Sequence, residues 1–288
     1  MKILLIGKTG QLGGDILKNN PGHEIYAPER NLLDITSNNS ITAMVQDYRP
    51  DVVINTAAFH IVPDCEIEFE KALQINCIGV RNLAMACKKT GSLFITFSSD
   101  YVFDGKKNTP YIEDDKPQPI QMYGISRISG EYAAMASYPD NSLIIRTCGL
   151  YGYSGARSKG GNFVDKRIQD ALAYKTIDMG CDQTVSPTYT DDLSHAVLRL
   201  MEHPLLEPGI YHLVNEGLCT WYDFTVAIYE IMKLKVMVNP VDRGGMSGNM
   251  RRPIFSALAN TRARSLGIVL PHWKDALERY LIKKYGKQ

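Results

Sequence analysis

A glycine-rich turn close to the N-terminus constrains the fold of this chain more than any other feature. An apolar run at 2–6 leads into Gly7, Gly10 and Gly13, and a helical pattern begins at Gln11. The run is too short to cross a membrane and has the length of a buried parallel strand. Glycines at this spacing allow a tight turn, a close approach of the backbone to a pyrophosphate, and close packing of helix against strand. The N–H groups at the start of the helix would then face that phosphate.

Strand-like apolar runs alternate with helical patterns through the first half of the chain. We expect strands at 2–6, 24–27, 51–55, 93–98 and 143–146, and helices that begin at 11 and 37 and cover about 68–89 and 122–136. Strands that alternate with helices are typical of parallel sheets with right-handed crossovers. The pattern predicts an α/β fold with a doubly wound parallel sheet of the Rossmann type.

The alternation of strands and helices loosens beyond residue 149, where Gly, Ser and Pro mark loops between shorter elements. We expect residues 1–148 to form a dinucleotide-binding domain, and residues 149–181 and 216–288 to form a smaller substrate-binding lobe. Residues 182–215 are expected to return to the first domain, because 209–214 has the pattern of a strand. The stretch 243–253, which is rich in Gly and Arg, is predicted to be a loop.

The composition predicts a globular protein without a surface for nucleic acid or membrane. Hydrophobic residues make up 44% of the 288 residues, and the net charge is +1 with acids and bases interspersed. The six cysteines are scattered, and neither they nor the histidines have the spacing of metal ligands, so we expect reduced thiols and no bound metal. Because only Lys2 precedes the first apolar run, no signal peptide is expected and a cytoplasmic location is predicted.

An acidic residue follows the second predicted strand, at the distance typical of dinucleotide-binding units. The carboxylate of Glu29 can accept hydrogen bonds from an adenosine ribose. Arg30 beside it, helped by Lys8 in the glycine turn, could instead meet a 2′-phosphate. Glu29 and Arg30 would also fit an ordinary solvated turn. The choice between NADPH and NADH therefore stays open, with a slight preference for NADPH.

Further cofactor contacts are expected from the glycine turn and from the ends of the following strands. Residues after the second strand would lie near the adenine, and those that end the third strand would lie beside the phosphates. The remaining predicted cofactor residues are Thr9, Gln11, Leu12, Asp34, Ile35, Thr56, Ala57, Ala58, Asn76 and Ser98.

Short-chain reductases need a tyrosine and a cation four residues later, because this spacing places both side chains on one face of a helix. Only Tyr123 and Arg127 open a helix shortly after a strand with a polar end, Ser98-Ser99-Asp100. Ser99, Tyr123 and Arg127 are therefore predicted to meet at the carboxyl edge of the sheet. Four further pairs have the same spacing and are interpreted as structural: Tyr26/Arg30, Tyr153/Arg157, Tyr229/Lys233 and Tyr280/Lys284.

The chemistry of carbonyl reduction explains why these three residue types belong together. Hydride transfer to a carbonyl leaves an alkoxide that needs a proton, and a phenol is a poor acid–base catalyst unless a nearby cation favours the phenolate. We expect Ser99 to hydrogen-bond the carbonyl oxygen, Tyr123 to deliver the proton, and Arg127 to supply the positive charge and hold the nicotinamide ribose.

At these residues the chain resembles the extended short-chain dehydrogenase/reductases, and among them the dTDP-4-dehydrorhamnose reductase family. The resemblance covers essentially the whole chain and implies an oxidoreductase that uses NAD(P)H to reduce the C4 keto group of a nucleotide-linked 6-deoxysugar, as in dTDP-L-rhamnose and polysaccharide biosynthesis. It also implies that Asn162 and Arg252 lie near the diphosphate and nucleoside of the substrate. The motifs that carry it are 7–13, 33–36, 98–105, 161–164, 182–183, 186–190, 209–213 and 252–253.

The chain departs from the family pattern at several positions of the expected site. The family's catalytic lysine is Arg127 here, and arginine is bulkier, planar and permanently charged. Ser99 stands where threonine is usual and keeps the hydroxyl. Gly149 replaces a tryptophan, which removes a large wall of the expected sugar pocket. The loss of this tryptophan and the presence of His60 suggest a different sugar. The segment after the third strand differs too: Phe59 replaces tyrosine, His60 threonine and Pro63 aspartate.

The expected partner is a sugar nucleotide, with dTDP as the expected nucleotide, and the chain is expected to form a homodimer. His60, Ser99, Tyr101, Gly149, Asn162 and Arg252 are the predicted substrate contacts. Two alternatives remain open. One is a reductase or epimerase that acts on another sugar nucleotide. The other is a non-catalytic relative that binds dinucleotide and regulates a partner protein, for which the changes at positions 127 and 149 would be typical.

Overall fold

Six strands pair in parallel to form the central sheet of the protein. The computed structural model describes residues 1–154, 160–248 and 250–286. In spatial order the strands are β10 (Gly209–His212), β5 (Ser142–Thr147), β4 (Leu93–Ser99), β3 (Val52–Asn55), β1 (Lys2–Ile6) and β2 (Glu24–Tyr26). The predicted fold class is confirmed, and each predicted strand of the sheet lies within two residues of its expected bounds.

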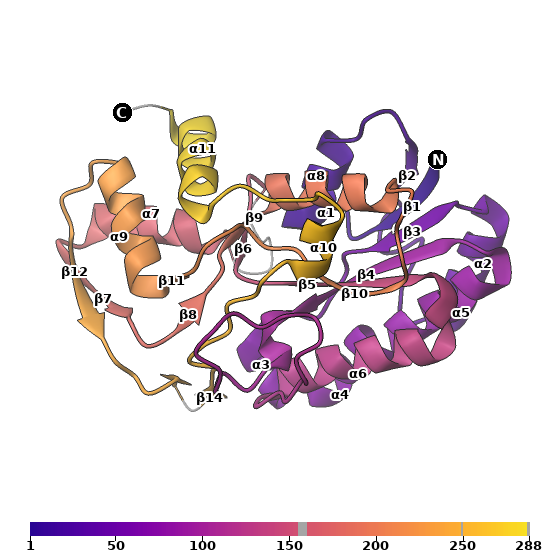
Figure 1. Cartoon of the computed structure of the whole chain (residues 1–288), viewed down its shortest axis with the longest axis horizontal. Coiled ribbons are helices and arrows are strands. Elements are labelled where there is room, and N and C mark those ends of the chain that lie inside the picture. Colours follow the sequence, from indigo (N-terminus) through magenta and orange to yellow (C-terminus); the bar gives the residue numbers. More distant parts are fainter. Residues whose placement is uncertain (155–159, 249, 287–288) are drawn as a thin grey trace.

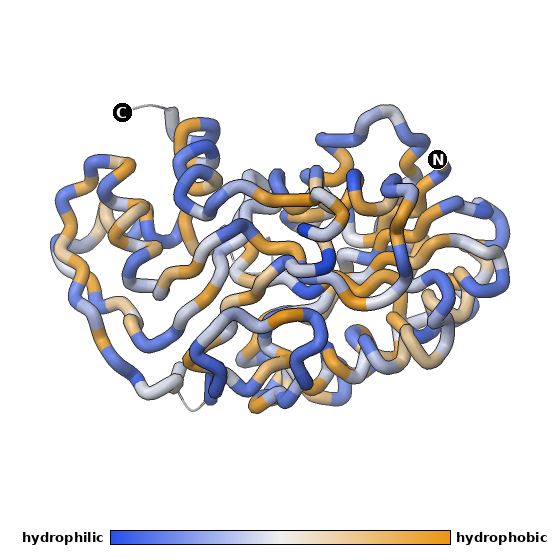
Figure 2. The backbone as a smooth tube through the Cα atoms, viewed as in Figure 1, coloured by the Kyte–Doolittle hydropathy of each residue, from blue (hydrophilic) through white to orange (hydrophobic). Residues whose placement is uncertain are grey.

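Helices cover both faces of this sheet (Figure 1). On one face lie α1 (Gln11–Lys18) and α8 (Thr190–Met201), and on the other lie α2 (Asn38–Tyr48), α5 (Val80–Thr90) and α6 (Met122–Ser137). Hydrophobic positions concentrate along the central strands (Figure 2). Strands buried on both faces need continuous apolar runs, which explains why these segments are apolar rather than alternating.

The predicted helix over 68–89 is wrong as a single helix. The structure has α3 (Val62–Ile67), α4 (Phe69–Leu73), a π-helical turn η1 (Gln74–Gly79) and then α5. A Cβ atom at Gly130 of α6 would clash with the backbone oxygen of Asn76 in η1, so the two helices approach each other closely there. A widened π turn often marks a functional site, and here it carries the predicted cofactor residue Asn76.

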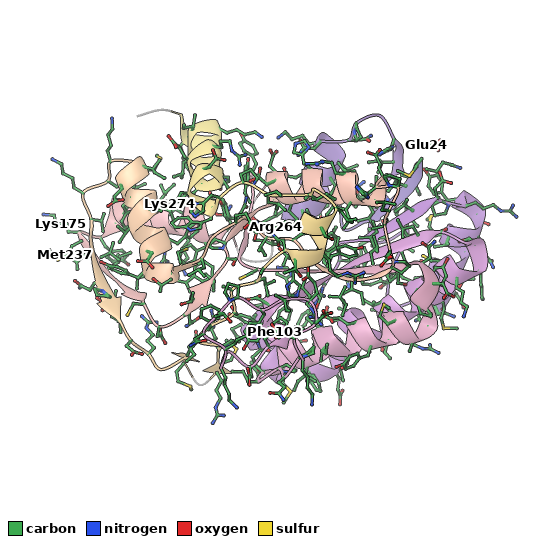
Figure 3. All side chains as sticks on the ribbon, viewed as in Figure 1. Glu24, Phe103, Lys175, Met237, Arg264 and Lys274 are labelled. Carbon is green, nitrogen blue, oxygen red and sulfur yellow. The ribbon has the colours of Figure 1, made fainter. Side chains whose placement is uncertain are left out.

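The second lobe has an aromatic core of its own and lies beside the sheet domain (Figure 1). Its outer side is a two-stranded parallel sheet, near the labelled residues Lys175 and Met237 in Figure 3. The main lobe elements are α7 (Phe163–Ala173), β7 (Thr176–Gly180), α9 (Trp221–Ile231), β12 (Met237–Val241) and α11 (Trp273–Tyr285).

The remaining elements of the described residues are short. They are η2 (Asp100–Val102), η3 (Pro139–Asn141), β6 (Leu150–Tyr151), β8 (Thr184–Val185), β9 (Thr188–Tyr189), β11 (Cys219–Thr220), β13 (Met246–Ser247), β14 (Met250–Arg251) and α10 (Thr261–Ser265). The stretch 243–253 contains the small hairpin β13–β14, so the expectation of a plain loop there needs correction.

Several segments after residue 181 pack against the sheet domain, which bears on the predicted domain boundaries. Helix α8 packs on the sheet and β10 pairs with β5, as expected for the segment 182–215. Ala263 of α10 also packs in the core beneath the sheet, although residues 216–288 were expected in the lobe. The boundaries themselves stay a prediction.

Two features are absent from the described residues, a membrane-spanning helix and a cluster of metal ligands. No helix among residues 1–154, 160–248 and 250–286 is long and apolar enough to span a bilayer. Within the same residues, no group of three or more His, Cys, Asp or Glu side chains is placed to hold a metal ion. The six cysteines are free thiols.

Candidate active site

The candidate active site lies at the carboxyl ends of the central strands, where the sequence placed Ser99, Tyr123 and Arg127. Ser99 is the last residue of β4, and Tyr123 is the second residue of α6. Two side chains fix the start of α6: Glu66 accepts a hydrogen bond from its first N–H at 2.8 Å, and Gln121 caps the N–H two residues later. Ligands of open α/β sheets bind at this edge.

The environment of Tyr123 keeps its phenol protonated. Burial raises the pKa of Tyr123, while the charge of Arg127 and hydrogen bonding with Ser99 lower it by less. The Arg127 guanidinium carbon lies 6.0 Å from the centre of the Tyr123 ring. A phenol that stays neutral until a cation stabilises its anion can act as a proton donor.

Arg127 is buried and is held by a neutral amide. Its Nη1 donates to Oδ1 of Asn76 at 3.3 Å. Asn76 in turn exchanges two hydrogen bonds with the backbone of Phe59 and donates to Ser126. Among the described residues no carboxylate forms a salt bridge with Arg127. Its positive charge is therefore available to the neighbouring phenol.

The Ser99 hydroxyl donates a hydrogen bond to the buried carboxylate of Asp100, to which the sequence analysis gave no role. Its Oγ donates to Oδ1 of Asp100 at 2.8 Å and accepts a hydrogen bond from the Tyr101 N–H at 3.2 Å. Ser256 and Cys148 donate to the other oxygen of Asp100 at 2.6 and 3.1 Å. The predicted hydrogen bond from Ser99 to a substrate carbonyl therefore requires this hydroxyl to turn away from Asp100. Burial raises the pKa of the Asp100 carboxyl. The hydrogen bonds from Ser99, Ser256 and Cys148 lower this pKa by less.

The side chain of Ser98, a predicted cofactor contact, points toward α6. Its hydroxyl donates to the carboxylate of Glu131, which forms an ion pair with Arg146 of β5 at 2.7 Å. All three side chains are buried. Arg146 also lies over the ring of Phe103, which is labelled near the centre of the molecule in Figure 3. The Ser98 hydroxyl thus helps to attach α6 to the sheet.

The glycine turn fits a bound pyrophosphate. Gly7 has a φ of +91°, and a Cβ there would lie 2.5 Å from Oγ1 of Thr56. A Cβ at Gly13 would clash with the carbonyl of Gly7, whereas one at Gly10 would be 3.4 Å from the same oxygen. Gly10 precedes α1 without a side-chain cap, so the first N–H groups of the helix stay available for an anion.

Four charged side chains lie between the glycine turn and the other end of the predicted nucleotide site. Lys8 in the glycine turn forms a 2.8 Å ion pair with Glu29 after β2. Asp34 accepts hydrogen bonds from the backbone and hydroxyl of Thr36 at 2.9 and 2.8 Å, which lower the pKa of this carboxyl together with the charge of Arg30. The predicted residues Glu29, Arg30 and Asp34 therefore lie in one charged group.

Gly149 adjoins a tryptophan from the lobe. It has a φ of +55°, and a Cβ at this position would lie 3.2 Å from Cη2 of Trp221 and 3.3 Å from Cα of Pro187. A tryptophan at position 149 therefore does not fit without displacing these groups. The ring of Trp221, missed in the sequence analysis, occupies the space beside the end of β5.

Tyr101 lies next to the proposed proton donor. The centre of its ring lies 6.1 Å from that of the Tyr123 ring, in an edge-to-face arrangement. Burial raises the pKa of Tyr101, and the charge of Arg252 lowers it by less. Tyr101 and Arg252 therefore share the surroundings of Tyr123, as their predicted contact with substrate requires. His60 is partly buried, with its Nδ1 3.4 Å from the backbone oxygen of Ala58.

Asn162 has a structural role in the lobe. Its Oδ1 caps α7 through the Asp165 N–H at 3.0 Å, and its Nδ2 donates to Gly152 and to Tyr280, both at 2.8 Å. A contact between Asn162 and substrate stays a prediction. Two further tyrosines, Tyr151 and Tyr189, stack on each other in the interior.

The other tyrosine–cation pairs for which the structure describes both residues do not lie beside Ser99 at the end of β4. Tyr26 ends the outermost strand β2, and Tyr229 and Tyr280 lie in the lobe core. Arg157, the cation of the pair that begins at Tyr153, lies outside the described residues.

Comparison with known proteins identifies the family. Residues 1–285 match the family described as the RmlD substrate binding domain. The chain belongs to this family. The resemblance predicted from the motifs is confirmed, and relatives named dTDP-4-dehydrorhamnose reductase align with nearly the whole chain.

Three similar proteins show how close the similarity is. The spore coat polysaccharide biosynthesis protein SpsK of Bacillus subtilis is 37% identical, over 97% of this chain and 96% of its own length. The dTDP-4-dehydrorhamnose reductase of Streptomyces griseus is 34% identical, over 95% and 91%. The solved structure of dTDP-4-dehydrorhamnose reductase from Bacillus anthracis in complex with NADP is 34% identical with a TM-score of 0.92, over 98% and 99%.

Proposed function

We propose that this protein is an NAD(P)H-dependent reductase of the C4 keto group of a nucleotide-linked 6-deoxysugar, with dTDP as the nucleotide. The meeting of Ser99, Tyr123 and Arg127 at the carboxyl edge of the sheet carries this proposal. It is supported by membership of the RmlD family and by relatives named as reductases of dTDP-linked sugars.

Each of the three residues of the site has its own role in the proposed reaction. A nicotinamide held at this edge of the sheet would supply the hydride that reduces the carbonyl carbon. Tyr123 donates its phenolic proton to the resulting alkoxide oxygen, which completes the hydroxyl group. Arg127 stabilises the phenolate left on Tyr123 and, being permanently charged, takes no proton itself. Ser99 orients the carbonyl oxygen once its hydroxyl turns from Asp100.

The cofactor would lie across the ends of the strands. Its pyrophosphate fits the turn from Gly7 to Gly13 and the start of α1, and its adenosine ribose would reach Glu29. Thr56, Ala57 and Ala58 follow β3 and would lie beside the phosphates. Asn76 contributes through Arg127, since its side chain is occupied with that guanidinium and with the Phe59 backbone.

A regulatory protein that binds dinucleotide without catalysis is the second candidate. The replacement of the family's lysine by Arg127 favours it. Against it, Arg127 still lowers the pKa of Tyr123, and Ser99 is retained beside that phenol. A cytoplasmic location and a homodimer stay part of the proposal for either candidate.

A substrate panel tests the proposed function. The purified protein is mixed with 4-keto-6-deoxy sugar nucleotides that differ in base and sugar, with NADPH or NADH, and the loss of reduced-nicotinamide absorbance is followed. We expect turnover with at least one dTDP-linked substrate. Because Gly149 and His60 depart from the family pattern, the best substrate is expected to differ from dTDP-4-dehydrorhamnose. Stoichiometric binding of cofactor without turnover across the whole panel would favour the regulator.

A further inference from the structure

The two oxygens of the buried Asp100 carboxyl have different partners. Ser256 and Cys148 both donate to Oδ2, at 2.6 and 3.1 Å, whereas Oδ1 lies 2.8 Å from the hydroxyl of Ser99. All four side chains are buried. A single proton on Oδ1 would leave both hydrogen bonds to Oδ2 in place and would change only the contact with Ser99. The carboxyl can therefore hold a proton without any rearrangement of its surroundings.

No cation is paired with this carboxyl in the part of the chain that the structure describes. Glu131, a buried carboxylate close to the site, differs in this respect, because Arg146 forms an ion pair with it at 2.7 Å. A buried carboxylate without a cation is costly, and such a group keeps its proton instead. The surroundings of Asp100 therefore favour the neutral acid.

The other titratable groups around the carboxyl do not supply a compensating charge. Burial raises the pKa of the Cys148 thiol and of the Tyr101 and Tyr123 phenols, so all three stay neutral near pH 7. The charges of Arg252 and Arg127 lower the pKa of Tyr101 and Tyr123 respectively, by less than burial raises it. Both cations thus act on the phenols and form no ion pair with the carboxyl.

The Ser99 hydroxyl has one proton to donate and two lone pairs to accept with. The Tyr101 N–H already donates to this oxygen at 3.2 Å. If Asp100 is ionised, the hydroxyl proton points to Oδ1 and a substrate carbonyl receives no hydrogen bond from it. If Asp100 is protonated, the acid donates to the second lone pair, and the hydroxyl proton is free for the carbonyl oxygen. Burial and an ionised Asp100 both raise the pKa of Tyr123, so a neutral Asp100 also opposes the phenolate less.

We propose that Asp100 is a positioning residue that holds a proton on Oδ1, donates it in a hydrogen bond to Ser99 and so directs the Ser99 hydroxyl at the substrate carbonyl. The proton stays on Asp100 during the reaction, and Tyr123 remains the donor to the alkoxide. This role rests on the proposed function, because it needs a carbonyl beside Ser99. The proton on Asp100 does not, since it is a property of the protein without substrate.

Infrared difference spectroscopy near neutral pH tests for the proton on Asp100 without substrate. The spectrum of the wild type minus that of Asp100→Asn should contain the carbonyl stretch of one protonated carboxylic acid. Asp191→Asn is the matched control. Burial raises the pKa of Asp191, but hydrogen bonds from Asn19 and two lysines lower it to about 2, so its difference spectrum should contain only carboxylate bands. Carboxylate bands alone in the Asp100→Asn difference would overturn the proposal, whatever the protein reduces.

The kcat values of three variants test whether Asp100 acts through Ser99. An amide keeps a donor toward Ser99 and an acceptor for Ser256, so Asp100→Asn should keep kcat within about threefold of the wild type. Asp100→Ala removes the donor and should lower kcat about tenfold, with unchanged affinity for dinucleotide. Adding Asp100→Ala to Ser99→Ala should lower kcat no further, because the two residues act as one unit.

The possible outcomes separate this role from the proposed function. A kcat as low in Asp100→Asn as in Asp100→Ala, a normal kcat in Asp100→Ala, or independent losses in the double variant would each overturn the positioning role and leave the reductase intact. Circular dichroism confirms that each variant is folded, and the infrared result on Asp100→Asn decides the protonation state if Asp100→Ala does not fold. No turnover by the wild type with any substrate of the panel would instead overturn the proposed function.

Discussion

Arg146 of β5 and Glu131 of α6 form a buried ion pair directly behind the candidate site. The Arg146 Nη2 lies 2.7 Å from one carboxylate oxygen of Glu131, and its Nε lies 3.0 Å from the other. Both side chains are at most 2% exposed. Glu131 follows Arg127 by four residues, so it lies one helical turn from the cation of the site and two turns from Tyr123. The pair fixes how α6 is rotated toward Ser99.

Loss of one partner of this pair should destabilise the protein strongly. In Glu131→Gln the guanidinium of Arg146 stays buried without a counter-charge, so the free energy of unfolding should fall by about 3–5 kcal/mol. Urea denaturation measures this change. Lys71→Met is the control, because it removes an exposed ion pair with Glu68 and should cost less than about 1 kcal/mol. Equal effects of the two substitutions would refute the structural role of the buried pair.

Two glycines of the turn should respond differently to substitution. Gly10 has an extended backbone with φ of −79° and space for a Cβ, so Gly10→Val should keep the fold and block the approach of a pyrophosphate. Gly13→Ala should lower the thermal midpoint, because its Cβ would clash with the Gly7 carbonyl. Circular dichroism melting reports the fold and dinucleotide titration reports binding. Normal nucleotide affinity in a folded Gly10→Val variant would show that the turn is only structural.

Arg127 should control the pH dependence of turnover. Because Arg127 lowers the pKa of Tyr123, Arg127→Met should raise that pKa and move the alkaline fall of the reductase rate to higher pH. The maximal rate should fall too, since the phenolate formed by proton donation loses its stabilising charge. The pH profile of kcat measures both effects. Arg127→Lys retains a cation and should keep the profile near that of the wild type. Full activity with an unshifted profile in Arg127→Met would make Arg127 a bystander.

Restoring the family's tryptophan at position 149 should damage the protein. The positive φ of Gly149 and the nearby Trp221 ring both oppose a side chain there. Gly149→Ala should therefore lower the free energy of unfolding by more than backbone strain alone would. Gly91→Ala is the control for strain, because Gly91 has a φ of +77° and no atom within 4 Å of its Cβ position. We expect about 1 kcal/mol for Gly91→Ala and about 1–3 kcal/mol more for Gly149→Ala, from urea denaturation. Gly149→Trp should be less stable still. An equal loss of unfolding free energy in the two alanine variants would mean that the Trp221 ring moves aside without a loss of stability.

Local sequence patterns predicted the features that depend on short spacing. The glycine turn, the strands of the sheet and the pair Tyr123/Arg127 each lie within a few residues of the signals that identify them. Features that depend on distant partners escaped prediction. Asp100 meets Ser256, and Trp221 meets Gly149, across stretches of chain that no periodicity connects.

The interruption of the helix over 68–89 shows the same limit. The apolar pattern there is helical throughout, but the close approach of Gly130 to Asn76 belongs to a contact between two helices. Tertiary packing of this kind decides the π turn, and the sequence of one helix does not contain it. The direction of the Ser98 side chain likewise depends on Glu131, a residue of another element.

Turnover by Tyr123→Phe shows most directly whether this site is that of a reductase with Tyr123 as proton donor. The variant keeps the ring and loses only the hydroxyl, so cofactor affinity should stay near that of the wild type. With the best substrate of the panel and saturating NADPH, kcat should fall by about a hundredfold or more, the range expected when a general acid is lost. A kcat close to that of the wild type would contradict the assignment of Tyr123 as the proton donor.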